Sequence, residues 1–285
     1  MQKKNYNIYK GQQFFKKRLK RTSRVIAFDL DETIGSFADL EILWSALQEY
    51  TDLQHPVNFN HLLDLYPEFL RYGIIPILKY IVEKKQTGEC SNVYIYTNNQ
   101  CGPGWVEMIT SYLDYTLKTD KPIFHQIISA FKINNLRIEP SRTTHSKSHS
   151  DFIRCTLMPK NTEIFFLDNA HFPEMKQTRV YYIQPKSYVH YLSTKDIIKR
   201  FISSQLCLTI NNANKSMLNS YLFTYFIHGD AYNNGNPHIH QLETDILVAQ
   251  KIMYHLRDFF FIINKNAKTK KAKKHIGRTT RKLLV

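Results

Sequence analysis

The 285-residue chain contains no long hydrophobic run. No apolar stretch approaches the roughly 20 residues that a helix needs to cross a bilayer, so we expect no membrane partner. The basic N-terminus also lacks the apolar segment of a secretion signal, which argues against export. The four cysteines are far apart and form no Cys-x-x-Cys pair. This spacing is typical of a reduced compartment, so we expect an intracellular protein of the cytoplasm or nucleus.

Acidic residues are missing from both ends of the chain. Residues 1–24 hold nine Lys and Arg, and residues 264–285 hold nine more, in both cases without an acid. The residues between them carry 21 basic and 24 acidic side chains, so the net charge of +15 belongs to the two ends. We expect a disordered basic arm over 1–23 and a disordered basic tail over 264–285, both attracted to nucleic acid or another polyanion.

The densest basic run of the arm is a candidate patch for nucleic-acid binding or nuclear localisation. A solvated tail whose charge only aids solubility is the alternative. The patch consists of Lys16, Lys17, Arg18, Lys20 and Arg21.

The chain between the basic ends has the composition of a globular protein. The sequence is 43% hydrophobic, contains 18 Tyr and 18 Phe, and is long enough to bury a sizeable core. We expect a main domain over 24–205, with a small cap insert at 36–72. An extension over 206–263 follows, and it ends in a long amphipathic helix from about 242 to 263.

Short apolar strands alternate with helices through the main domain. The run Val25-Ile26-Ala27-Phe28 is apolar throughout, which indicates a strand buried on both faces. We expect further strands near 92–97, 126–130, 163–167 and 180–183, and a hairpin around Asn134-Asn135. The alternation predicts an α/β fold, in which a parallel sheet of about five strands is flanked by helices.

Polar residues stand where three of these strands end. Asp29 and Asp31 follow the first strand, Thr97 follows the second, and Asp168 with Asn169 follows the fourth. The carboxyl ends of parallel strands meet at one edge of a sheet, where ligands bind. A cation, Lys147, comes before the fourth strand, and we expect it to join the same crevice.

These residue types suit phosphoryl transfer. One carboxylate can attack phosphorus and form an aspartyl-phosphate, while a second protonates the leaving oxygen and later activates water. The hydroxyl of Thr97 and the ammonium of Lys147 can hold the phosphoryl oxygens. Asp29 and Asp168 are oxygen ligands suited to Mg²⁺, which would offset the repulsion between carboxylate and phosphate.

The motif Asp29-Leu30-Asp31-Glu32-Thr33 after a buried strand resembles motif I of the haloacid-dehalogenase (HAD) superfamily of phosphatases. Glu32 and the pair Asp168-Asn169 resemble the group related to the phosphatases of the RNA polymerase II C-terminal domain. The resemblance covers roughly residues 24–205. The basic ends and asparagine-rich style also resemble members encoded by large DNA viruses, which leaves a virion-associated location open.

The resemblance implies a HAD-like, Rossmann-type fold and an assignment of roles. The nucleophile would be Asp29, the acid and base Asp31, and the further catalytic residues Thr97 and Lys147. The Mg²⁺ site would be formed by Asp29, Asp31 through its backbone carbonyl, Asp168 and Asn169. The phosphate-binding residues would be Thr33, Thr97, Asn98 and Lys147.

Three alternatives remain open at the level of sequence. Arg142 or Lys160 could take the place of Lys147. The substrate implied first is a protein phosphoserine or phosphothreonine, but Thr97-Asn98-Asn99-Gln100 also resembles the Thr-Asn-Gln of polynucleotide 3′-phosphatases. A third possibility is a non-catalytic, nucleic-acid-associated protein that uses the fold as a scaffold.

Overall fold

The computed structural model describes residues 5–15, 22–51, 57–210, 214–229 and 239–279, and for 239–240 and 262–279 the backbone alone. The predicted patch from Lys16 to Arg21 lies outside these residues. No helix within the described part of the chain is both long and apolar enough to cross a membrane.

A six-stranded mixed sheet forms the centre of the molecule, with the spatial order β1-β8-β7-β2-β3-β4. The five strands from β8 to β4 run parallel, and β1 pairs antiparallel with β8 at one edge. The predicted α/β class and five parallel strands are confirmed, while the sixth strand makes the sheet mixed. The strands are β1 (Tyr6–Lys10), β2 (Arg24–Phe28), β3 (Asn92–Tyr96), β4 (Gln126–Ile128), β7 (Glu163–Leu167) and β8 (Val180–Pro185).

The edge strand β1 corrects the prediction of a disordered arm over 1–23. Its residues Tyr6, Ile8 and Tyr9 are aromatic or β-branched, which suits a half-buried strand, and Tyr9 packs against Tyr182 of β8. A 3₁₀ helix, η1 (Gln12–Phe15), then buries Phe14 against Tyr181 and Phe259. This part of the arm is therefore built into the fold.

Helices cover both faces of the sheet. On β2, Ile26 and Phe28 face the larger hydrophobic core, while Val25 and Ala27 face the smaller one, as the two-residue period of a strand requires. The smaller core is closed by α5 through Phe152. The helices are α1 (Ala38–Tyr50), α2 (Phe59–Asp64), η2 (Pro67–Phe69), α3 (Ile74–Gln86), α4 (Pro103–Leu117), α5 (His149–Thr156), η3 (Pro173–Met175), α6 (Thr194–Ser203), α7 (Gln205–Leu208), α8 (Lys215–His228) and α9 (Ile239–Thr279).

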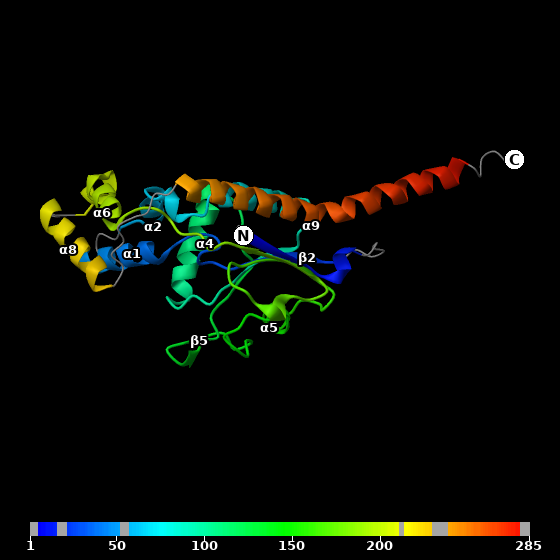
Figure 1. Cartoon of the computed structure of the whole chain (residues 1–285), viewed down its shortest axis with the longest axis horizontal. Helices are drawn as coiled ribbons and strands as arrows, with labels where there is room; N and C mark the ends of the chain where they lie inside the picture. The colour runs from blue at the N-terminus through cyan, green and yellow to red at the C-terminus, as the bar shows by residue number, and fades with distance from the viewer. Residues whose placement is uncertain (1–4, 16–21, 52–56, 211–213, 230–238, 280–285) are drawn as a thin grey trace.

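The extension packs on the main domain, and α8 lies beside α1 and α6 (Figure 1). The long helix α9 runs along the body, in contact with β8 and α3, and its C-terminal part projects beyond it (Figure 1). Leu256, Phe259 and Phe260 form its buried face. The backbone is helical to Thr279, which corrects the prediction of a disordered tail over 264–279; residues 280–285 lie outside the described part.

The predicted hairpin is present as β5 (Lys132–Ile133) and β6 (Leu136–Arg137). Its turn residues, Asn134 and Asn135, both have positive φ values of 48° and 63°. Asparagine tolerates this left-handed conformation better than most residues do, which explains the choice of Asn-Asn.

Candidate active site

The first part of the site is the loop after β2. Asp29 follows the last residue of the strand, and its backbone amide donates to Leu167 of neighbouring β7 at 2.9 Å. A tight turn follows, closed by hydrogen bonds from Thr33 and Ile34 to the carbonyl of Leu30. Because β2 is held between β3 and β7, the loop lies at the carboxyl edge of the sheet.

Asp168 and Asn169, at the end of β7, reach the same edge because β7 runs parallel to β2. The two loops are joined by the hydroxyl of Thr33, which donates to Asn169 Oδ1 at 2.8 Å and to Asp29 Oδ2 at 3.1 Å. The Thr33 side chain is fully buried. The Thr33 hydroxyl thus ties the two loops together, and Thr33 is not among the residues that line the cavity described below.

Lys147 stands between the two loops. Its Nζ lies 2.5 Å from Asp29 Oδ1 and 2.6 Å from Asp168 Oδ2, and only 1% of the residue is exposed. The next residue, Ser148, caps α5 by accepting a hydrogen bond from the amide of Asp151, and its own amide donates to the Tyr96 hydroxyl. The cap and the strand β3 therefore hold Lys147 in place, and Lys147 is the predicted lysine that reaches the carboxylates.

The loop after β3 completes the site. Thr97 is buried at the end of the strand, and Asn99 donates from Nδ2 to Asp31 Oδ2 at 2.8 Å. The fully buried Arg142 donates to the Thr97 carbonyl and to Asn98 Oδ1 at 2.9 and 2.7 Å. Arg142 thus fixes the loop that carries Thr97, rather than taking the place of Lys147.

Burial shapes the charges of the site. Burial raises the pKa of Asp31 to about 6, because it outweighs the hydrogen bond from Asn99, and the charge of Asp29 adds to the rise. Burial works against the ammonium of Lys147, but Asp168 and Asp29 outweigh it and raise the lysine pKa. The pKa of Asp168 is raised by burial despite Lys147, since two carboxylates share one ammonium.

The site opens into a cavity of about 420 Å³. Seven residues selected from the sequence line it: Asp29, Asp31, Thr97, Asn98, Lys147, Asp168 and Asn169. No described residue of the 36–72 insert lines the cavity; its helices join the larger core instead. Asn99 is a site residue that the sequence reasoning did not select, although it stands in the polar run after β3. Arg142, an alternative to Lys147 at the level of sequence, instead holds the loop that carries Thr97.

The donor set fits a hard divalent cation. Within the described residues no three His, Cys, Asp or Glu side chains converge as a ready metal cluster. Mg²⁺, however, is usually held by one or two carboxylates and keeps several waters. Asp29 and Asp168 supply two carboxylates that a single lysine ammonium bridges, so one positive charge faces two acidic groups.

Comparisons with protein-family models, with curated proteins and with solved structures find no match for this chain.

Proposed function

We propose that the chain is a phosphomonoester hydrolase of the HAD type that works through an aspartyl-phosphate. The observation that carries the proposal is the buried Lys147, which bridges Asp29 and Asp168 while Asp31 lines the same cavity with a raised pKa. One carboxylate is held in place next to a cation, and a second is able to carry a proton near neutral pH. A two-step phosphoryl transfer requires these two groups, a carboxylate nucleophile and a carboxyl proton donor.

In the first step an Asp29 oxygen attacks phosphorus, and the bond from phosphorus to the ester oxygen breaks. Asp31 gives its proton to that oxygen, and the alcohol leaves. In the second step Asp31 takes a proton from water, which attacks phosphorus and breaks the bond to Asp29. Inorganic phosphate is released, Asp29 regains its carboxylate, and Asp31 is protonated again.

Other side chains bind and orient the phosphoryl group. Thr97 and Asn98 line the cavity, and the ammonium of Lys147 offsets the charge of the phosphoryl oxygens. Asp29, Asp168, Asn169 and the backbone carbonyl of Asp31 would hold Mg²⁺. When bound, the ion would polarise the phosphoryl group and offset its charge.

A protein phosphoserine or phosphothreonine is the substrate we propose first. None of the described residues of the insert at 36–72 lines the cavity, so this insert does not cover the carboxylates and a macromolecule can approach them. A polynucleotide 3′-phosphate is the second candidate, because α9 carries the basic residues of 264–279 on a projecting helix (Figure 1).

The test is turnover of three substrates with and without Mg²⁺: p-nitrophenyl phosphate, a phosphoserine peptide and a 3′-phosphorylated oligonucleotide. We expect Mg²⁺-dependent release of phosphate, with the peptide preferred over the oligonucleotide. Asp29→Asn should lower kcat to the background rate, because the nucleophile is lost. Full activity of Asp29→Asn would refute the assignment, and no turnover of any phosphoester would favour a non-catalytic, nucleic-acid-associated scaffold.

A further inference from the structure

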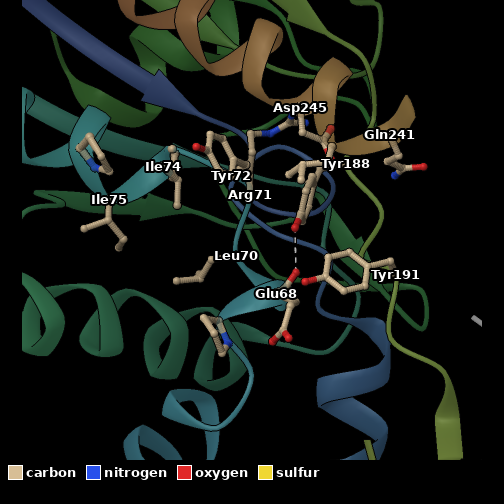
Figure 2. A pocket seen from close by; sticks show the side chains of 14 residues that line it. Glu68, Leu70, Arg71, Tyr72, Ile74, Ile75, Tyr188, Tyr191, Gln241 and Asp245 are labelled. Atoms are coloured by element: carbon tan, nitrogen blue, oxygen red, sulfur yellow. Dashed lines mark hydrogen bonds between the residues drawn. The ribbon is translucent and has the colours of Figure 1, made fainter. Parts of the chain in front are cut away.

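A second and larger pocket, of about 590 Å³, lies next to the candidate active site. Three parts of the chain form it: the segment from Pro67 to Pro76, the loop around Tyr188 and Tyr191, and the first turns of α9 (Figure 2). The amide of Gln241 on α9 donates to the carbonyl of Val189 at 2.8 Å, which ties the helix to that loop. The C-terminal extension therefore builds one wall of the pocket.

The lining offers apolar and aromatic surface to an incoming group. Tyr72, Tyr191 and Leu242 are 48%, 46% and 50% exposed, although each is large enough to be buried at a gain in stability. In Figure 2 the tyrosines of the pocket come from two segments, Tyr72 from one and Tyr188 and Tyr191 from the other, and the Tyr188 hydroxyl donates to the carbonyl of Glu68 at 2.8 Å. The size and the lining match those of a site for a side chain or small ligand.

Most of the charged groups in the lining already have partners. Arg71, which is 1% exposed, donates to the backbone carbonyls of Thr33, Glu32 and Lys186. Glu68 forms a two-pronged ion pair with Arg200 at 2.8 and 2.9 Å.

Asp245 lies beside Arg71 at the α9 wall (Figure 2). Burial raises the pKa of Asp245, although the charge of Arg71 opposes the rise. Asp245 lines the pocket, so its carboxyl oxygens can accept a hydrogen bond from a ligand there. Among the described residues that line the pocket, Arg71 is the one basic residue and is 1% exposed, so the pocket offers little to the phosphates of a nucleic acid.

The pocket and the active-site cavity lie on either side of Glu32. Glu32 lines the catalytic cavity, and its carbonyl accepts hydrogen bonds from the Arg71 guanidinium and from the backbone amide of Tyr188, which both line the second pocket. Glu32 also has a positive φ of 55°, a strained conformation that these contacts hold in place. Glu32 therefore connects the lining of the active-site cavity with that of the second pocket.

We propose that the second pocket is a docking subsite for a phosphoprotein substrate. It binds an apolar or aromatic side chain that lies a few residues from the phosphorylated residue of that substrate. A hydrogen-bond donor of the same substrate chain faces Asp245. The proposal rests on the phosphatase function proposed above and makes it specific. The enzyme recognises a hydrophobic residue near the phosphorylated residue as well as the phosphate itself.

The test uses the full chain and a set of phosphoserine peptides of equal length, in which one Phe replaces Ala at successive positions. Phe at one offset from the phosphoserine should lower KM about tenfold relative to the all-Ala peptide, since it buries an apolar side chain. Tyr191→Ser and Leu242→Ser should each raise KM for that peptide to within about twofold of the all-Ala value. A matched control is Tyr115→Ser, which removes an equally exposed tyrosine from α4 and should keep the preference.

The controls separate this proposal from the function on which it rests. Turnover of p-nitrophenyl phosphate together with one KM for all peptides would overturn the docking subsite and leave the phosphatase intact. A preference for Phe that survives both pocket variants would also overturn it. If Tyr191→Ser weakens only a 3′-phosphorylated oligonucleotide, the pocket stacks a base and the proposal is wrong. No turnover of any phosphoester would remove the phosphatase function and the subsite with it.

Discussion

Lys147→Met tests the geometry of the site without any substrate. The ammonium of Lys147 lies 2.5 Å from Asp29 and 2.6 Å from Asp168, and its side chain is 2% exposed. Methionine has a similar length and no charge, so the substitution leaves two buried carboxylates without their cation. Removing one partner of a buried ion pair destabilises a protein by about 3–5 kcal/mol.

The sign of the pH dependence follows from the carboxylates. Burial already raises the pKa of Asp168 in the native protein, and without Lys147 nothing in that pair opposes the rise. The folded variant then binds more protons than the unfolded chain, so its stability is highest at low pH and falls as pH rises through the raised pKa. The variant should therefore lose the largest part of its free energy of unfolding, relative to the wild type, near pH 8 and a smaller part near pH 5.

Urea unfolding at the two pH values measures the effect. A loss of about 4 kcal/mol, with an m value of about 3 kcal/mol/M, lowers the midpoint by about 1.3 M. The double variant Lys147→Met with Asp168→Asn is the control, because it removes one of the two carboxylates and should recover much of the loss at pH 8. A loss below about 1 kcal/mol at pH 8, or one that does not shrink at pH 5, would refute a lysine buried between two carboxylates.

Two further predictions concern the proton donor and the edge of the fold. Because Asp31 must be protonated to act as the acid, its pKa of about 6 predicts that kcat/KM falls above about pH 6. Asp31→Asn should lower kcat about 10²- to 10⁴-fold and remove that limb of the pH–rate profile; an unchanged profile would contradict the role. Phe14→Ala should lower the free energy of unfolding by about 3–5 kcal/mol, because it empties the space against Tyr181 and Phe259. Thermal or urea unfolding of Phe14→Ala checks this, with exposed Phe15→Ala as the matched control; equal stability of the two variants would mean that the arm does not pack on the sheet.

Features of the site that depend on local pattern could be read from the sequence. Each predicted strand of the parallel sheet is present, and the polar residues at the ends of β2, β3 and β7 line one cavity. The reason is that a buried parallel strand requires an apolar run, and the parallel arrangement brings the strand ends together. Asp29, Thr97 and Asp168 were found in this way.

Features that depend on long-range contacts could not be read from the sequence. The pairing of β1 with β8 joins Asn7 to Gln184, and the composition of the arm, rich in lysine, masked its strand character. The bridging hydroxyl of Thr33 and the hydrogen bond from Asn99 to Asp31 depend on the relative placement of separate loops. The same holds for the choice of Lys147 over Arg142 and Lys160.

Local hydrophobic patterns and turn residues were enough to establish the α/β class, the order of the parallel strands along the chain and the polar residues at their ends. The tertiary structure alone decided which side chains touch. It set Lys147 between two carboxylates, and it buried Thr33 as a bridge between loops. It also laid α9 beside η2 to form the second pocket, since packing between distant segments is recorded in no single stretch of sequence.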